Sequence, residues 1–320
     1  MKSKIKAFFS SSVIDRLIVI IPITVFGVWA FGTRVLTLVI LSAAVSSGLD
    51  FACAAITKKP ESFLNGESLI IGLLLPLCFP ASAPLWMVAL ADFIAIVPVK
   101  RFLNSNGIIS LSPCITAMAV IYAIFPAAMM TFGAFGTKYS FSDFSPSVVP
   151  AKTELDILAE GTVPENSLFD FLFGSRTGTI GEICVALIII AFIWLVSKKL
   201  ISADIPIAYA VVLFAISYLK PNLLMASDLI ALQYAACRLL CGSTAFVVVF
   251  FGSEPGTAPK TSRGRMIVGA VGGAAAYLCT KYLSAYVAPV FSVLLMNLLS
   301  YPADLILRPG NIFGGKIKKS

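Results

Sequence analysis

The amino-acid sequence predicts an all-α, polytopic membrane protein of about ten transmembrane helices, arranged as two five-helix inverted halves with broken helices. The 320-residue chain is 58% hydrophobic and 12% charged, and its mean hydropathy is +0.95. Soluble domains carry about a quarter charged residues, so this chain has too little polar surface to cover a water-soluble globule. Such a composition suits lipid, because spanning helices satisfy their own backbone polar groups.

The spacing of the apolar runs is the second observation. A spanning helix needs about 20 apolar residues, and ten runs approach that length: 16–32, 35–57, 67–80, 84–99, 113–135, 180–197, 204–219, 223–252, 266–282 and 285–306. The third run, which ends at Pro76 and Pro80, and the fourth run are short, and the eighth is interrupted near Arg238 and Gly242. Such runs are typical of broken helices, which build sites near the bilayer midplane.

The distribution of basic residues is the third observation. With the N-terminus in the cytoplasm, the cytoplasmic segments hold 17 of the 24 Lys and Arg residues, the outer segments hold six, and Arg238 lies inside a run. Because cytoplasmic loops carry the excess of Lys and Arg, we expect a multi-pass protein with both termini cytoplasmic. The net charge of +8 then reflects topology within membrane lipid, and no nucleic-acid partner is expected.

A polar stretch divides the chain into three predicted units. They are a first transmembrane half (1–135), an outer loop (136–179) and a second transmembrane half (180–320). Each half has a glycine followed by a carboxylate at the start of a helix, Gly66-Glu67 and Gly181-Glu182. Five runs in each half place the halves in opposite orientations, as an inverted repeat requires.

Several kinds of chemistry are excluded by composition. The chain has no histidine, which removes haem–His ligation, His-based zinc sites and Ser-His-Asp catalysis. The seven cysteines form no Cys-x-x-Cys pair and lie in or beside apolar runs, where small buried thiols are ordinary. No metal site and no complete active site of its own are expected.

Six carboxylates lie within or at the ends of apolar runs: Glu67, Asp92, Glu182, Asp204, Asp228 and Glu254. Buried carboxylates in a membrane are costly and mark ion or substrate paths. Asp92 and Asp228 lie deeper in their runs, so we expect them to lie on an ion path or to join a buried network. Glu67, Glu182 and Asp204 open helices, where an acid also suits the positive end of the helix dipole.

The segment 252–264 combines a carboxylate, Glu254, with two prolines and with hydroxyls that include Thr257. Amides and hydroxyls of this kind hold a polar ligand or an ion, and a plain cytoplasmic turn with basic anchors is the alternative. The following helix carries Gly269, Gly272 and Gly273, which predict close helix packing.

Four stretches, in order along the chain, resemble the family that holds the D subunit of the Rnf complex and the B subunit of the Na⁺-translocating NADH:quinone oxidoreductase. They are Gly66–Leu75, Phe125–Met129, Thr177–Glu182 and Phe250–Gly264, the last followed by a glycine-rich helix and Leu294–Leu298. The last stretch is similar to the family's A-T-D-P-x-T-S-P-x-T-x-x-G-R. The resemblance covers about residues 20–307. It implies a subunit of a prokaryotic plasma-membrane complex that relays electrons through flavin, coupled to Na⁺ or H⁺ movement.

The resemblance also implies cofactors. The family carries FMN on a threonine in S-G-A-T-P-L-A, and the corresponding stretch here, Pro150–Asp156, makes Thr153 the candidate for covalent FMN. Pro-Ala-Lys precedes this threonine and Ser147 replaces the family's acidic residue, so an ordinary loop threonine is the alternative. A second, non-covalent flavin such as riboflavin is implied before helix five, where Gly107–Pro113 replaces G-Q-N-P-F-N-P. The other candidate cofactor-binding residues are Glu182, Glu254 and Thr257.

The implied partners are the other subunits of an Rnf-like or Nqr-like complex, including a subunit with covalent FMN. These partners would supply NADH oxidation, because this chain has no G-x-G-x-x-G unit and no cysteine cluster for iron–sulfur. Two alternatives remain open: a flavin-free solute channel or permease on the same scaffold, and a membrane scaffold of an electron-transfer chain that pumps no ion.

Overall fold

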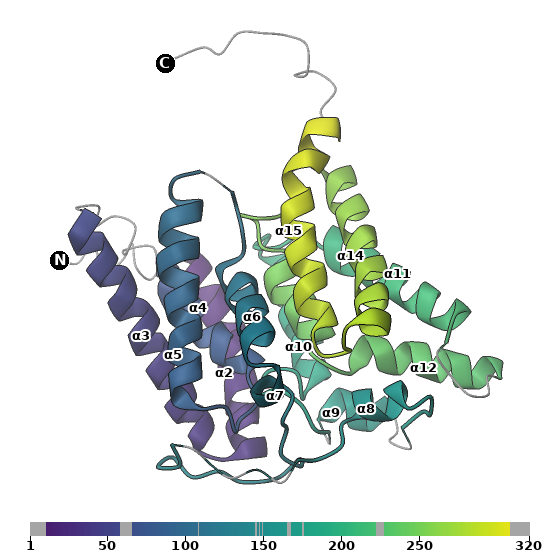
Figure 1. Ribbon diagram of the computed structural model, residues 1–320. Coiled ribbons are helices and arrows are strands. Elements are labelled where there is room, and N and C mark those ends of the chain that lie inside the picture. Colours follow the sequence, from purple (N-terminus) through teal and green to yellow (C-terminus); the bar gives the residue numbers. More distant parts are fainter. Residues whose placement is uncertain are drawn as a thin grey trace.

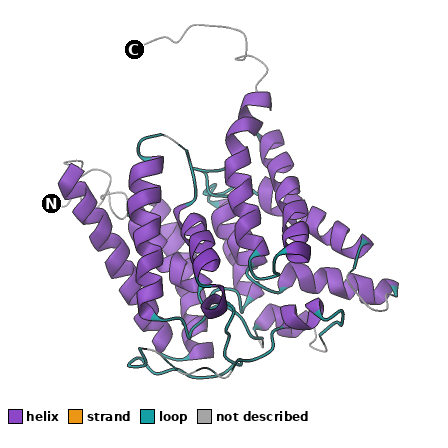
Figure 2. Ribbon diagram, viewed as in Figure 1, coloured by secondary structure: helices purple, strands orange, loops and turns teal. Residues whose placement is uncertain are grey.

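The computed structural model describes residues 11–57, 66–107, 109–144, 146, 148, 150–164, 168–174, 176–221 and 227–307. Regular structure in these residues is helical, and no strand occurs among them (Figure 2). The predicted all-α fold is therefore confirmed. The predicted cytoplasmic termini, Lys58, Lys59 and Ser147 lie outside the described residues.

Two sets of apolar helices flank a group of short ones (Figure 1). The first set is α2 (Ser11–Phe31), α3 (Arg34–Thr57), α4 (Glu67–Leu74) with η2 (Leu75–Cys78), α5 (Leu85–Ile94) with η3 (Ala95–Asn104), and α6 (Pro113–Ile124). The short helices are α7 (Pro126–Met129), α8 (Glu154–Ala159) and α9 (Leu168–Phe173). The second set is α10 (Val185–Ser197), α11 (Asp204–Leu219), α12 (Asp228–Leu240), α13 (Thr244–Val247) with η4 (Val248–Gly252), α14 (Ser262–Tyr282) and α15 (Ala288–Leu307).

Length and hydropathy agree with membrane insertion. Among the described helices, α2, α3 and α15 are long and apolar enough to span a membrane, and α12 with α13–η4 makes a fourth candidate, bent by 51°. Shorter apolar helices include Glu67–Cys78, Pro113–Ile124, Val185–Ser197 and Asp204–Leu219. The total of ten spans stays a prediction.

The predicted breaks are confirmed in two runs. The third run ends as the short α4–η2 at Cys78. The eighth run is interrupted between Leu240 and Thr244, where Gly242 has a φ of +68°, a left-handed conformation that glycine adopts at no steric cost.

The predicted ends of two other runs are wrong. The fourth helix does not stop at residue 99 but continues as a π-helix to Asn104, because Lys100 and Arg101 pair with the buried Asp50 of α3 instead of ending the helix in solvent. The fifth run does not continue to residue 135. Its helix α6 ends at Ile124, since Pro126 lacks the backbone N–H that would continue the hydrogen bonding.

The helix packing has the same pattern in both halves. In each half the second helix (α3 or α11) packs against the third and fourth elements, and the fourth packs against the fifth. Across the halves, the first helices α2 and α10 contact one another, and so do the fifth helices α6 and α15. This pairing agrees with two like halves related by an internal axis.

The bundle has two chemically different ends. The loop face carries α7, α8 and α9 and lies at the bottom of Figure 1. The opposite end, the basic face, carries Lys100 and Arg101 of η3 and Arg265 of α14. Each half has an ion pair between its second and fourth elements at this end, Asp50–Arg101 at 2.6 Å and Asp204–Arg265 at 2.8 Å.

The glycines of α14 allow the tightest helix contact, as predicted. A Cβ at Gly273 would lie 2.5 Å from the carbonyl oxygen of Tyr209, and one at Gly269 would lie 2.7 Å from that of Ile205. Both obstacles are backbone atoms of α11, which cannot move aside without shifting a helix.

We expect Gly273→Ala to destabilise the protein by about 1–3 kcal/mol, the usual cost of forcing an extra carbon into a packed core. Gly48→Ala in α3 is the matched control, because a Cβ there meets no atom within 4 Å. Thermal unfolding in detergent would show a lower melting temperature for Gly273→Ala alone. Equal melting temperatures for the two variants would contradict this packing.

Candidate functional site

A cavity of about 530 Å³ lies at the basic face, between the half-helices α4–η2 and α13–η4. Its apolar walls include Ile70 and Ile71 of α4 and Phe250 and Phe251 of η4. Polar and charged side chains also line it, among them Arg16, Glu67, Lys100, Ser110, Glu254 and Thr257. Cofactor pockets are typically about 300–1,000 Å³, mostly apolar, with a few placed polar groups.

Broken helices leave backbone carbonyls without partners inside the helix, and N–H groups of the second half bind some of these carbonyls. The carbonyl of Leu77 at the end of η2 accepts a 2.7 Å hydrogen bond from the N–H of Gly181, and that of Phe79 accepts a 3.1 Å bond from Ile180. The stretch that enters α10 is therefore joined directly to the end of the first half-helix.

Arg34, at the start of α3, satisfies two carbonyls in the turn that follows η2. Its guanidinium donates to the carbonyls of Ala81 at 2.5 Å and Ala83 at 2.9 Å. It also donates to the carbonyls of Asp143 and Phe144 in the loop face, at 2.5 and 3.1 Å. Although charged, Arg34 is 0% exposed, because each of these bonds replaces one that water would make.

Arg176 has the same role at the second break. It is 2% exposed and donates to the carbonyls of Leu240, the last residue of α12, and Glu182. A cation beside the carbonyl end of a helix is also favoured by the helix dipole. The two breaks are thus both bound by a buried arginine from another part of the chain.

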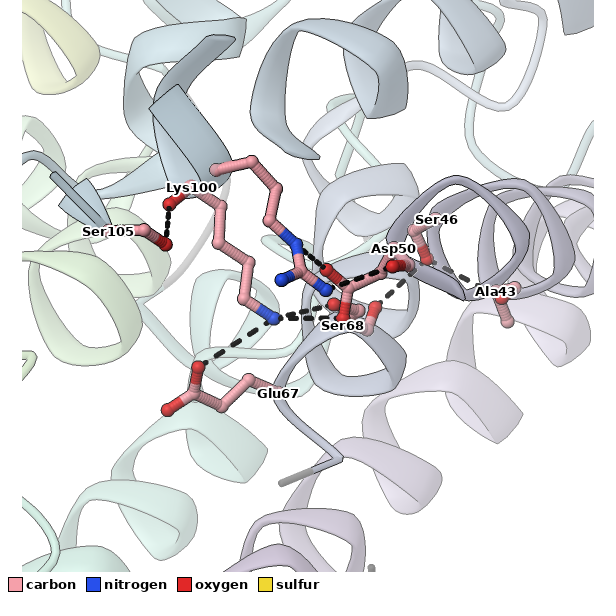
Figure 3. Close-up of polar contacts among 8 residues, drawn as sticks. Ala43, Ser46, Asp50, Glu67, Ser68, Lys100 and Ser105 are labelled. Carbon is pink, nitrogen blue, oxygen red and sulfur yellow. Dashed lines mark hydrogen bonds and ion pairs between the residues drawn. The ribbon is translucent and has the colours of Figure 1, made fainter. Parts of the chain in front are cut away.

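A charged network closes one side of the cavity (Figure 3). The Lys100 ammonium lies 3.3 Å from Asp50 and 3.7 Å from Glu67, and it donates a 2.6 Å hydrogen bond to the Ser68 hydroxyl. Arg101 donates to the other carboxylate oxygen of Asp50 at 2.6 Å. Sequence reasoning missed the role of Asp50, Lys100 and Arg101, although an acid inside an apolar run was a signal that it used elsewhere.

Glu254 and Thr257, both predicted, line the cavity together. They lie in one turn between η4 and α14, where the N–H of Thr257 bonds to the carbonyl of Glu254 at 3.1 Å. Burial raises the pKa of the Glu254 carboxyl, and the charge of Arg16 opposes that rise. The Ser112 hydroxyl, which is also buried here, opposes that rise as well.

The stretch before α6, where the second flavin was predicted, contributes Ser110, Leu111 and Pro113 to the cavity. Asn104 holds this stretch in place, because its side-chain amide donates to the carbonyl of Leu111 at 2.8 Å and accepts from its N–H at 3.0 Å. Ile108 lies outside the described residues.

Thr153 lies away from the cavity, at the loop face, as the N-cap of α8 in a capping box with Asp156. It is 2% exposed, and its hydroxyl bonds to the Asp156 carboxylate at 3.0 Å and to the Tyr286 hydroxyl. Attachment of FMN at this oxygen would form a phosphodiester and would place its negative charge beside a carboxylate. The nearby Lys152 ammonium already pairs with Glu160 at 2.6 Å. This arrangement fits a helix cap and does not fit an attached FMN.

The remaining predicted residues are separated from one another. Glu182 is buried near the loop face, beside Arg176. Asp92 is 0% exposed in α5, where one carboxylate oxygen accepts a 2.9 Å bond from Ser42. Asp228 is exposed and opens α12, where an acid suits the helix dipole, and its place on an ion path stays a prediction.

The cavity fits a flavin better than the surroundings of Thr153 do. A flat, largely apolar ring system suits the space between Ile70–Ile71 and Phe250–Phe251, and its polar edge suits the hydroxyls of Ser110 and Thr257. The Lys100 ammonium is a fixed positive charge at the same wall. No cluster of three His, Cys, Asp or Glu residues that could hold a metal ion occurs among the described residues.

Comparison with known proteins supports a membrane protein that works within a larger complex. The model of the NQR2, RnfD, RnfE family matches residues 5–312. The chain is similar, at 26% identity over 90% of its length and 87% of the relative's, to the D subunit of the proton-translocating ferredoxin:NAD(+) oxidoreductase complex of Clostridium ljungdahlii. It is also similar to the D subunit of the ion-translocating oxidoreductase complex of Halorhodospira halophila, at 25% identity with 90% and 87% covered. The D subunit of the ion-translocating oxidoreductase complex of Citrobacter koseri is 25% identical, with 92% of this chain and 91% of the relative covered.

We expect Arg176→Met to lower the stability of the folded protein by at least about 3 kcal/mol, because it leaves two buried carbonyls without donors. Lys152→Met is the control, since the Lys152 side chain is 62% exposed and its ion pair is on the surface. Thermal unfolding in detergent measures both. A melting temperature of Arg176→Met equal to that of the control would contradict the assigned role.

Proposed function

This chain belongs to the NQR2, RnfD, RnfE family as a membrane subunit of an ion-translocating electron-transport complex, and on that premise we propose that it relays electrons through a flavin bound non-covalently in the basic-face cavity. The observation that carries this proposal is the cavity itself. It joins two half-helices, aromatic walls and a polar, charged rim in one space of about 530 Å³. FMN and riboflavin both present the ring system that this space suits.

A bound flavin supplies electron transfer in one- or two-electron steps, and the protein supplies position and electrostatics. Phe250 and Phe251 hold the ring plane, and Ser110 and Thr257 orient its polar edge. The Lys100 ammonium favours the added negative charge of a reduced ring, because opposite charges attract strongly where water is excluded. Asp50 and Glu67 keep that ammonium in place.

The basic face is cytoplasmic in this proposal, because positively charged segments favour the cytoplasmic side of a prokaryotic plasma membrane. The loop face then lies outside, where a partner protein with covalent FMN would exchange electrons with this chain. The coupling ion is Na⁺ or H⁺. The relatives' names describe ion-translocating complexes, and one describes a proton-translocating complex.

Thr153 serves as a helix cap in this proposal. Covalent attachment of FMN at Thr153 is a separate prediction of the sequence, and a denaturing gel distinguishes the two. A solute channel on the same scaffold would give a colourless native preparation, and a non-pumping scaffold would transfer electrons without moving ions.

We expect the purified complex to release about one flavin from this chain on denaturation, while the band of this chain stays dark under in-gel fluorescence. Ile71→Trp fills the cavity wall and should lower the released flavin at least about tenfold. Ile190→Trp is the control, because Ile190 is 61% exposed on α10 and does not line the cavity. Chromatography of the released flavin measures both variants.

Two outcomes would overturn the proposal. One is a native complex without released flavin. The other is a fluorescent band that disappears in Thr153→Ala, with no non-covalent flavin in the cavity.

A further inference from the structure

A buried carboxylate beside the cavity has one oxygen without a partner. Asp92 of α5 is 0% exposed. Its Oδ1 accepts a 2.9 Å hydrogen bond from the Ser42 hydroxyl, and its Oδ2 has no hydrogen-bond partner in the described structure. A charge buried without a counter-ion is very unfavourable, so such a carboxyl is stable in its protonated, neutral form. The site is therefore suited to gain and lose a proton.

Polar side chains on one face of α3 connect this carboxyl with the basic face. Ser42, Ser46 and Asp50 are spaced four residues apart, which places them one above the other along the helix, and all three are 0% exposed. A run of polar groups in an otherwise apolar helix is costly in lipid. We call these three residues the α3 column.

Each member of the α3 column bonds to a neighbouring helix. Ser46 donates to the carbonyl of Ser68 in α4 at 2.9 Å. The Ser68 hydroxyl accepts a 2.6 Å bond from Lys100, whose ammonium also bonds to Asp50 at 3.3 Å (Figure 3). Lys100 and its partner Glu67 line the cavity, and the Glu67 side chain is 57% exposed. The α3 column thus lies between Asp92 and the water-accessible carboxylate of Glu67.

Gly72 lets α4 approach the column closely. A Cβ at this position would meet the Ser46 hydroxyl and would lie 2.7 Å from the carbonyl of Ser42. Side chains four residues apart on a helix face are separated by about 5–6 Å, so the step from Ser46 to Ser42 is the size of one water molecule. Ser46 bonds to the backbone carbonyl of Ser68, which carries no proton, so the step between the Ser46 hydroxyl and the Ser68 hydroxyl also needs a water molecule.

The donor set at Asp92 suits a proton and does not suit a metal cation. Hard cations take about six oxygen ligands, whereas Asp92 has one hydroxyl partner, Ser42. The Cys114 thiol of α6 is close enough to Asp92 to interact with it electrostatically. A thiol is a poor ligand for such ions, and Cys114 also lines the cavity.

We infer that Asp92 takes up a proton from the basic face along the α3 column, and that this is the proton-uptake step of the complex. In this step the Asp92 carboxylate gains one proton, and water at the Glu67 end of the column supplies that proton. The inference rests on the proposed function, because an electron held in the cavity supplies the driving charge. Cys114 lines the cavity and interacts electrostatically with Asp92, so a negative charge in the cavity stabilises the protonated form.

The test is proton movement by the whole complex in proteoliposomes, followed with a trapped pH dye. Reduced methyl viologen is the electron donor, NAD⁺ is the acceptor and the buffer is free of Na⁺. We expect Asp92→Asn to lower the rate of proton movement at least fivefold and Asp92→Glu to restore at least half of it. Ser42→Ala and Ser46→Ala should each lower it at least twofold.

Matched controls come from the other half. Ser217→Ala removes a buried hydroxyl without a partner on α11, and Asp204→Asn removes the carboxylate of the equivalent ion pair. Both should move protons at the wild-type rate. Size-exclusion chromatography checks that every variant assembles into the complex. If Asp92→Asn does not assemble, the rate of proton movement by Asp92→Glu still decides the test.

Proton movement at the wild-type rate in Asp92→Asn overturns the inference. So does a wild-type complex that transfers electrons in this buffer without moving protons, and that result leaves the proposed electron relay intact. A wild-type complex without cavity flavin instead overturns the proposed function.

Discussion

Two buried guanidinium groups satisfy backbone carbonyls at the breaks, Arg34 in the turn that follows η2 and Arg176 at the end of α12, and the rest of the structure depends on them. In a bilayer, each unsatisfied backbone group costs several kcal/mol, so a helix can stop inside the membrane only where a donor meets its carbonyls. Arg34 meets Ala81 and Ala83, and Arg176 meets Leu240. Both arginines are buried, and their hydrogen bonds also hold the loop face against the helix bundle.

Both half-helices line the cavity with the ends that lie away from their breaks. α4 contributes Glu67, Ile70 and Ile71 from its start, and η4 contributes Phe250 and Phe251 from its end, so the cavity is the space between them at the basic face. That space receives one wall from each half, as expected for a site at the interface of two repeats. Cys114 lines the cavity and interacts electrostatically with Asp92, which links the proposed electron site with the proposed proton site.

Most of the fold was predictable because membrane insertion constrains every residue of a span. The break at Gly242 and the close packing at Gly273 were predicted from glycine alone. The end of the fourth helix was predicted wrongly. A lysine that follows an apolar run looks like the end of a span, and the partner of Lys100, Asp50, lies 50 residues away. Bonds from arginine to distant carbonyls leave no local pattern either. Glu254 and Thr257 were found from the composition of segment 252–264 and from the resemblance, whereas the α3 column, which includes Asp50, required the tertiary structure.

The central claim is that the cavity between the two half-helices binds a flavin, while buried arginines hold the breaks of those half-helices. The most direct measurement is a density map of the intact, oxidised complex by electron cryomicroscopy. We expect a flat, three-ring density between Ile71 and Phe251, with Arg34 and Arg176 on the carbonyls of the two breaks. A map in which the half-helices pack together without such a density, or in which lipid chains fill the space, would contradict the claim.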